Sequence, residues 1–243
     1  RGEILGYFEG GFAALIDALV DAVGRENVVT GARATELGVR GGTVESITVG
    51  TASGTERRPT DGVVVATMPN VLEELTGYTC DIDFQGAVCA VVTMDEPLTE
   101  TYWLNVAHDA PFGALIEHTN FVPPARYGGD HLCYVASYVQ DPSEDVWRMD
   151  DDALRETWLG HIAGMFPGFD PADVREFRVA RNPRAAPVYE RGYLEMVVPY
   201  ELSEAVGEGV YYAGMASRAQ YPERSLNGGV VAGFECADRI AEN

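Results

Sequence analysis

The residues best suited to chemistry gather between positions 209 and 243. Gly209 to Ala213 predicts a short buried strand that ends at Gly214, and apolar side chains of residues 226–240 recur at helical spacing. Gly228 and Gly229 fall in the first turn of that helix, where each costs about 1 kcal/mol relative to alanine. Glycine there leaves room for a ligand or a second backbone, and free N–H groups at a helix start favour an electron-rich partner. The stretch therefore predicts either a ligand-binding helix start or an ordinary, tightly packed strand–helix unit.

Arginines and tyrosines near this stretch are candidate substrate ligands. The loop before the helix carries Arg218, Tyr221 and Arg224, and an earlier extended segment carries Arg184 and Tyr189. A guanidinium group forks onto carboxylate or phosphate, so these residues are predicted to bind an anionic substrate. In a chain with a formal net charge of −21, pairing of such arginines with surface carboxylates is the alternative.

Other polar patterns are weaker. Residues 117–121 (Glu-His-Thr-Asn-Phe) either face a substrate cavity or satisfy the end of a strand, and Arg181 is either a substrate ligand or a surface ion-pair partner. No GxSxG elbow is present, and no general base is identifiable, so the catalytic residues stay unknown. The histidines (His108, His118, His131, His161) have no metal-ligand spacing, so no metal site is expected. The tryptophans (Trp103, Trp147, Trp158) are expected to fill the core rather than line a site.

The elements that position these residues follow from periodicity. Helices are predicted at 12–23, from an Asn70 cap to Leu75, and at 150–166. The predicted strands are 28–29, a hairpin of 34–39 with 44–49, a strand 63–66 buried on both faces, then 87–94, 102–107, 114–118, 131–139 and 174–179, with 182–189 extended. These elements indicate an α+β fold with a mixed or antiparallel sheet and helices on one face.

The strand, Ala213-Gly214, loop and glycine-bearing helix start resemble the C-terminal closure of two-domain FAD-dependent oxidoreductases. That superfamily includes flavin amine oxidases, protoporphyrinogen oxidases, phytoene desaturases and UDP-galactopyranose mutases. The resemblance implies FAD as cofactor, an FAD-domain part at 1–80, a substrate domain at 81–205 and FAD contacts at 206–243. The FAD-contacting positions that it implies are Arg33, Ala34, Ala66, Gly214, Met215, Ser225, Leu226, Asn227 and Gly228. Met215 departs from the acidic residue usual beside that glycine.

Two absences refine the resemblance. No strand–GxGxxG–helix unit is present, and the chain does not begin with Met, so we expect an FAD-binding segment upstream. No lysine is present anywhere, including the first strand of the expected substrate domain, which disfavours a lysine-dependent amine oxidase. The expected function is oxidation of a small molecule by hydride transfer to flavin. A UDP-galactopyranose mutase-like isomerase and a non-catalytic binding module are the alternatives.

Composition restricts the setting of the protein. All 17 basic residues are arginines, against 38 Asp plus Glu, a pattern that indicates halophilic adaptation because molar salt screens acidic self-repulsion. Without a basic stripe, nucleic acid is an unexpected partner. No long apolar run or signal peptide is evident, and four widely spaced cysteines favour free thiols in a reducing cytoplasm.

Overall fold

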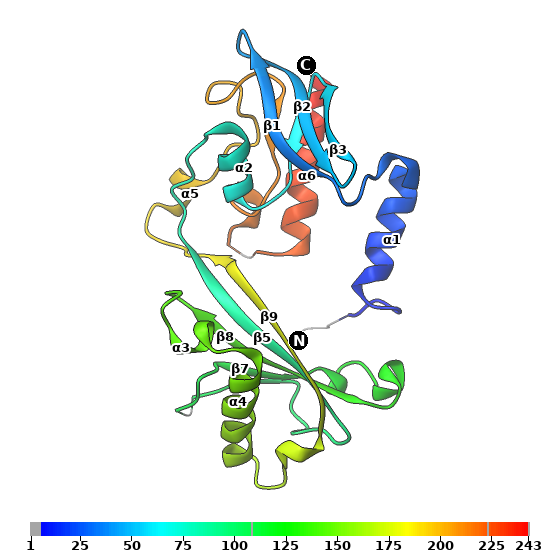
Figure 1. Cartoon of the computed structure of the whole chain (residues 1–243), viewed down its shortest axis with the longest axis vertical. Coiled ribbons are helices and arrows are strands. Elements are labelled where there is room, and N and C mark those ends of the chain that lie inside the picture. Colours follow the sequence, from blue (N-terminus) through cyan, green and yellow to red (C-terminus); the bar gives the residue numbers. More distant parts are fainter. Residues whose placement is uncertain (1–5, 108, 223, 243) are drawn as a thin grey trace, which may run out of the picture. The chain divides into compact units, whose positions relative to one another are not determined.

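The computed structural model describes residues 6–107, 109–222 and 224–242. The chain forms two compact units, which we call the split unit (Arg1–Ile82 with Tyr189–Asn243) and the middle unit (Asp83–Val188). The fold is mixed α+β, with a five-stranded antiparallel sheet, a three-stranded sheet, a parallel strand pair and, in the described parts of the chain, six α-helices (Figure 1). This confirms the predicted fold class.

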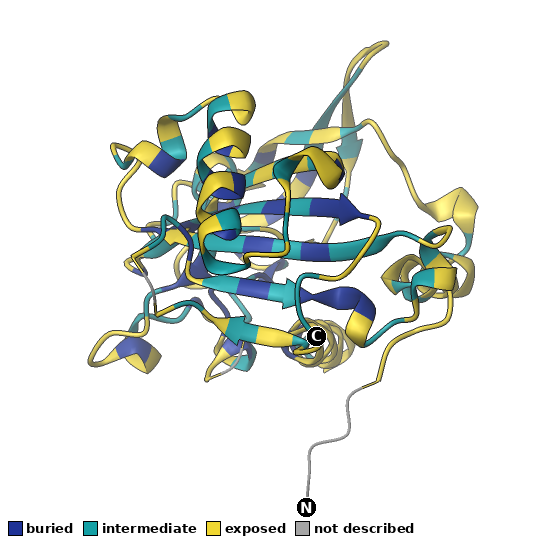
Figure 2. Cartoon of the chain, turned by 90° about the horizontal axis from the view of Figure 1, so that it is seen from below, coloured by how far each residue is buried: buried dark blue, intermediate teal, exposed yellow. Residues whose placement is uncertain are grey.

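The middle unit is built on the five-stranded sheet. Its strand order is β6-β7-β8-β5-β9, and all neighbouring strands are antiparallel. Val88, Ala90 and Val92 on β5 are fully buried, whereas the residues between them are half-buried. Figure 2 shows buried and half-buried positions alternating along strands. This alternation is that of a strand with one face in the core. The strands are β5 (Phe84–Met94), β6 (Trp103–Asn105), β7 (Ala114–Glu117), β8 (His131–Val139) and β9 (Val174–Pro187).

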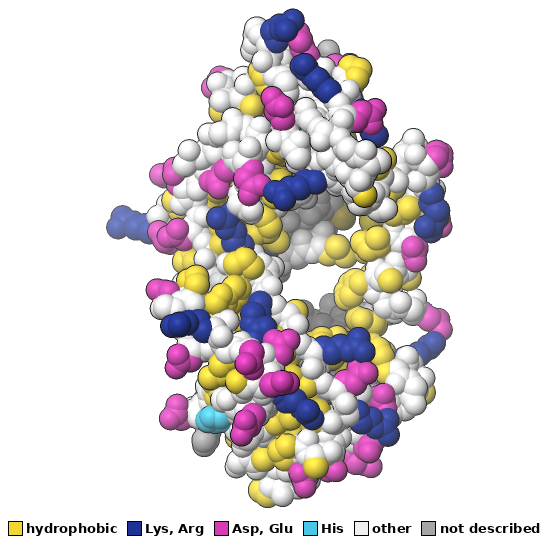
Figure 3. Space-filling view, viewed as in Figure 1, with side chains coloured by type: hydrophobic (Ala, Val, Ile, Leu, Met, Phe, Trp, Pro, Cys, Tyr) yellow, Lys and Arg dark blue, Asp and Glu magenta, His cyan; other side chains and the backbone are white. Residues whose placement is uncertain are grey.

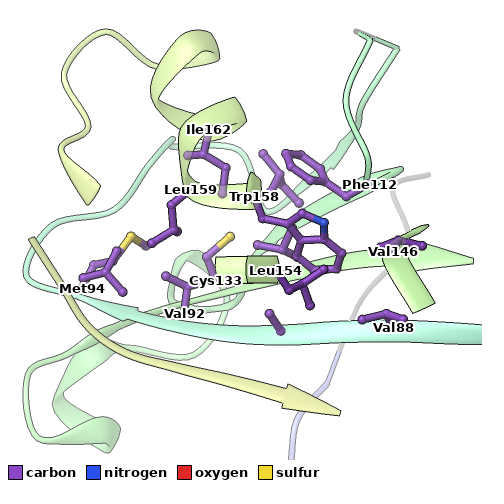
Figure 4. Packing of buried hydrophobic residues seen from close by; sticks show 14 of the residues in the cluster. Val88, Val92, Met94, Phe112, Cys133, Val146, Leu154, Trp158, Leu159 and Ile162 are labelled. Atoms are coloured by element: carbon purple, nitrogen blue, oxygen red, sulfur yellow. The ribbon is translucent and has the colours of Figure 1, made fainter. Parts of the chain in front are cut away.

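Helix α4 (Asp151–Met165) covers the buried face of this sheet. Its N-cap is Asp150, whose carboxylate accepts a hydrogen bond from the Ala153 N–H at 2.8 Å. Trp158 is fully buried, and its ring meets that of Phe112 edge-on at 5.6 Å (Figure 4). The shorter helices of this unit are α3 (Asp145–Arg148), η2 (His118–Asn120), η3 (Pro124–Tyr127) and η4 (Pro171–Asp173). The middle unit therefore has its own core.

Strand β9 is longer than predicted. It joins the expected strand 174–179 and most of the extended segment after it into 14 residues. Pro183 and Pro187 are tolerated because β9 is the last strand in the sheet order, where a missing N–H leaves no neighbour without a partner. Trp103 also differs from expectation: its side chain is exposed on the short strand β6, so it does not fill the core.

The split unit holds a meander, β1-β2-β3. The predicted hairpin is confirmed as β1 (Arg33–Arg40) and β2 (Thr43–Thr51), and β3 (Gly54–Pro59) was not predicted. The expected strand at 28–29 is wrong: these valines follow the 3-10 helix η1 (Arg25–Asn27) and precede Gly31, whose φ of 65° turns the chain.

A parallel pair joins the two sequence segments of the split unit. Strand β4 (Val63–Val65) pairs with β10 (Val210–Tyr212). Val64 is 40% exposed, so the prediction that this strand is buried on both faces is wrong. In the described parts of the chain, β10 is the only strand paired with β4. A local sequence pattern does not show how many neighbours a strand has.

The helices of the split unit are α1 (Phe12–Val23), α2 (Pro69–Thr76), α5 (Tyr193–Met196) and α6 (Leu226–Glu242), with the 3-10 helix η5 (Arg218–Gln220). The boundaries predicted for α1 are confirmed. The Asn70 cap is wrong: Met68 is the N-cap and Pro69 occupies the first helical position, where its ring already has helical φ.

Two of these helices carry apolar stripes without cover in the described chain. On α1 no residue is buried, and Phe12, Ile16, Leu19 and Val23 are all at least half exposed. On α6, Gly228, Ala232 and Cys236 are buried, whereas Leu226, Val230 and Phe234 on another face are exposed. Figure 3 shows hydrophobic side chains gathered on the surface of α1. An apolar stripe of this kind is typical of a helix that packs against a further layer.

Candidate functional site

The carboxyl ends of the parallel pair bring Ala66 and Gly214 together. Ala213 donates from its N–H to the Val65 carbonyl at 3.0 Å, so the segments that leave β4 and β10 start side by side. Tyr212 fixes this corner: its hydroxyl donates to the Thr67 carbonyl at 3.1 Å and accepts the Ala216 N–H at 3.1 Å. Ligands of open α/β sheets bind outside the carboxyl ends of parallel strands.

Gly214 is required by this corner itself. A Cβ added there would lie 1.9 Å from the Thr67 carbonyl oxygen, a contact that no side chain can make. The glycine therefore serves close packing of two chain segments. Neighbouring Met215 is half-buried.

The start of α6 is open. Ser225, Leu226 and Asn227 are exposed, and the Ser225 hydroxyl accepts the Gly228 N–H at 3.1 Å. The N–H groups of Leu226 and Asn227 have no acceptor within the described residues. The first turn of α6 thus offers free donors and the positive end of a 17-residue helix.

The structure explains one of the two glycines in this turn but not the other. A Cβ at Gly228 would lie 2.7 Å from the Ala219 carbonyl oxygen, so the second backbone expected there belongs to η5. A Cβ at Gly229 would meet nothing closer than the Gln220 amide nitrogen at 3.9 Å, an ordinary contact. Gly229 is exposed, and no described atom explains the helix-weakening residue.

Arg33 and Ala34 lie at the start of β1. The Arg33 guanidinium donates to Glu74 of α2 at 2.9 Å, and α2 follows directly after β4. Both partners of this ion pair are more than half exposed, so it contributes little to stability.

Three tyrosines form one aromatic cluster in the split unit, which we call the tyrosine cluster. The ring centroids of Tyr189 and Tyr193 are 4.7 Å apart, and those of Tyr189 and Tyr221 are 5.3 Å apart. Tyr193 and Tyr221 stack at 5.5 Å. Tyr189 and Tyr221 are 38% and 42% exposed, whereas Tyr193 is buried. Burial raises the pKa of Tyr193 to about 12, so its phenol stays protonated near neutral pH.

Gln220 connects the tyrosine cluster to the start of α6. Its side chain is buried and accepts the Ser225 N–H at 3.1 Å, and its backbone carbonyl accepts the Tyr189 hydroxyl at 3.0 Å. The predicted cofactor side and substrate side are therefore neighbours within the split unit. Sequence reasoning missed Gln220, and an isolated amide in a loop gives no signal by which to find it.

The arginine candidates separate into different environments. Arg218 and Arg224 are exposed in the loop between β10 and α6. Arg184 lies on β9 of the middle unit, so its place beside the tyrosine cluster stays a prediction. Arg181 donates to Asp151 at 2.6 Å and to the Met149 carbonyl at 2.8 Å, which favours the surface ion-pair interpretation.

The polar residues after β7 form hydrogen bonds with one another and with nearby backbone groups at the end of the strand. Glu117 is fully buried and accepts the Leu98 N–H and the Thr119 hydroxyl, each at 3.0 Å. Burial raises the pKa of Glu117 above its ordinary value, and these hydrogen bonds oppose that shift. His118, also buried, contacts the Tyr127 hydroxyl at 2.6 Å. Each group is engaged inside the middle unit.

The remaining candidates add no site. All four cysteines are free thiols, with Cys133 and Cys236 buried. Of the histidines, His108 lies outside the described residues, and no grouping of three possible metal ligands occurs in the described part. No described helix is long and apolar enough to cross a membrane.

Comparison with known proteins gives the family. The family model for flavin-containing amine oxidoreductases matches residues 1–241, so the chain belongs to this family. No curated protein matches.

Solved structures show the same fold at low identity. Reduced UDP-galactopyranose mutase has a TM-score of 0.72 at 15% identity, and the match covers 96% of this chain and 52% of that one. An oxidoreductase from Methanosarcina mazei has a TM-score of 0.68 at 16% identity, and the match covers 93% of this chain and 55% of that one. Cyclohexylamine oxidase from Brevibacterium oxydans has a TM-score of 0.64 at 15% identity, and the match covers 96% of this chain and 52% of that one. The chain thus spans about half the length of these structures.

Proposed function

We propose that this chain is the substrate-binding and flavin-edge part of an FAD-dependent oxidoreductase that oxidises a small molecule. The observation that carries the proposal is the open first turn of α6, which lies next to the tyrosine cluster through Gln220. Family membership supports flavin as the cofactor.

The residues at this turn fit an electron-rich planar group. Ser225, Leu226 and Asn227 would hold its edge through backbone donors and the helix dipole, and Gly229 would leave space for the ring. Ala66 and Gly214, at the carboxyl ends of the parallel pair, would form the neighbouring wall, with Met215 beside them; Arg33 and Ala34 would lie toward the nucleotide end. When bound, FAD supplies the hydride acceptor.

The chain's own contribution is binding and orientation. Tyr189 and Tyr221 present exposed ring surface to a substrate, and the buried phenol of Tyr193 stays neutral. No lysine is available as a base or to hold a water, so a lysine-dependent amine oxidation is disfavoured. Hydride transfer from an activated C–H bond has no requirement for such a base.

A further segment of polypeptide would complete the cofactor site. The chain spans about half of its structural relatives, and the apolar stripes of α1 and α6 are exposed. We infer that an FAD-binding segment covers these stripes and holds the pyrophosphate.

The test uses the full gene product and a glycine pair. We expect it to purify with flavin absorbance, and Gly229→Ala to weaken FAD binding about tenfold or more, since a methyl group takes the ring's space. The same change adds helix propensity and so stabilises the protein by up to about 1 kcal/mol. Gly228→Ala should instead destabilise it by about 1–3 kcal/mol, because the new Cβ meets the Ala219 carbonyl.

The matched control is Gly164→Ala on α4, where a Cβ also meets nothing within 4 Å. It should leave FAD binding unchanged. A gene product without flavin affinity, or unchanged affinity in Gly229→Ala, would remove the basis of the proposal. If UDP-galactopyranose perturbs the reduced flavin but no substrate reduces the oxidised form, the mutase alternative replaces oxidation.

A further inference from the structure

The tyrosine cluster combines exposed aromatic surface with a buried hydroxyl that has no hydrogen-bond partner among the residues that the structure describes. Tyr193 is 3% exposed, and its hydroxyl has no hydrogen-bond partner in the described structure. Leaving a buried hydroxyl unpaired costs about 1–3 kcal/mol. Its ring packs against Tyr189 and Tyr221, so the unpaired hydroxyl belongs to the same cluster as the exposed rings.

Two arginines in the turns that carry the cluster also lack side-chain partners within the described part of the chain. Arg191 lies in the tight turn between Tyr189 and Tyr193, which the Tyr193 N–H closes onto the Glu190 carbonyl at 3.1 Å. Arg218 begins η5, and its carbonyl accepts the Tyr221 N–H at 3.1 Å. Both arginines are exposed, and neither side chain makes a hydrogen bond or ion pair with a described residue.

This absence is unusual for the split unit. The chain has more than two carboxylates for each arginine, with 38 Asp plus Glu against 17 Arg. The other arginines of this unit that make ion pairs hold a carboxylate each: Arg25, Arg33, Arg40, Arg58 and Arg239. Arg191 pairs with no described carboxylate, although Glu190 and Glu195 are close in sequence. Arg57 of this unit also lacks a carboxylate, but it donates to the Ser46 hydroxyl at 2.7 Å, whereas Arg191 and Arg218 have no side-chain partner among the described residues.

We propose that the tyrosine cluster, with Arg191 and Arg218, binds a planar aromatic or conjugated ligand that carries at least one carboxylate. The exposed rings of Tyr189 and Tyr221 stack on the ligand, and the guanidinium groups fork onto its carboxylate. A simple cationic amine would gain ring contacts but would meet two like charges. This inference rests on the proposed function, for which it names the substrate class as anionic.

The test titrates three isosteric probes into the 243-residue chain at fixed ionic strength: naphthalene-2-carboxylate, naphthalene-2-carboxamide and 2-naphthylmethylammonium. Calorimetry gives the affinities. We expect the carboxylate to bind about tenfold more tightly than the amide, because charge-assisted hydrogen bonds are the stronger ones. Arg218→Gln and Arg191→Gln should each reduce that preference, and Tyr221→Leu should weaken all three probes.

Arg58→Gln is the matched control, because Arg58 pairs with Glu56 on β3. It should leave the preference intact. Tighter binding of the ammonium probe, no binding of the carboxylate, or a preference that survives the double arginine variant would overturn the proposal. Flavin binding by the full gene product is measured separately, so either result can fail while the other holds.

Discussion

At the scale of single residues, Glu117 is the clearest titratable group outside the candidate site. It is fully buried opposite Cys133 of β8, and its carboxylate ties the Leu98 N–H and the Thr119 hydroxyl together. The Thr119 oxygen also contacts His131 at 3.3 Å, and this imidazole opposes the rise of the Glu117 pKa. Burial is the larger effect, so the folded pKa lies above the unfolded one.

The raised pKa of Glu117 predicts how the stability of the protein depends on pH. The stability that Glu117 contributes is fully present below its unfolded pKa and is lost as pH rises through the folded pKa. Glu117→Gln mimics the protonated acid, so the unfolding free energy of the variant should rise relative to that of the wild type as pH increases above about 4, the ordinary pKa of a glutamate. Urea unfolding at several pH values measures the difference. Glu100→Gln, at an exposed position of the same unit, is the control; a Glu117→Gln difference that stays constant with pH contradicts the prediction.

At the scale of elements, α1 is the informative case. Its sequence specifies an amphipathic helix, and the structure confirms its boundaries, yet its apolar stripe is exposed. Burial of such side chains normally stabilises a protein by about 1.5–3 kcal/mol each. We therefore expect other polypeptide to cover this stripe.

Polar replacement of residues in this stripe tests whether the stripe is exposed or covered by other polypeptide. In the 243-residue chain, Ile16→Ser with Leu19→Ser should change the unfolding free energy by no more than about 0.5 kcal/mol per site, as at other surface positions. In the full gene product, the double change should cost about 2–5 kcal/mol, because it removes buried methyl groups. Denaturant unfolding of both proteins gives the comparison. Equal effects in both would mean that nothing covers α1.

At the scale of the whole molecule, charge is the dominant feature. The ion pairs of the described chain are mostly exposed, and exposed pairs contribute only about 0–1 kcal/mol each. They do not offset the self-repulsion of a chain with a formal net charge of −21. We therefore expect salt to stabilise the protein by screening this repulsion.

We expect the melting temperature to rise steadily between about 0.1 M and about 2 M KCl, where the Debye length falls from about 10 Å to below about 3 Å. Differential scanning calorimetry measures it. A variant with several exposed Asp and Glu residues changed to Asn and Gln should be more stable at low salt and show a flatter salt response. A melting temperature that falls with KCl would contradict halophilic adaptation.

The sequence by itself determined the local elements, because periodicity and capping act over a few residues. The α+β class, the limits of α1, the hairpin and β8 all follow from such short-range patterns. The glycine-bearing start of α6 was also visible, since propensity marks those glycines as costly.

Only the tertiary structure decided how these elements use their surfaces. Gly228 is set by the Ala219 backbone, Gln220 joins the tyrosines to α6, and β9 runs on through two prolines at a sheet edge. It also left Val64 exposed, and it left two guanidinium groups in the loops of the tyrosine cluster without a partner among the described residues. The physical reason is that burial and pairing depend on which distant segments meet, and no local pattern carries that information.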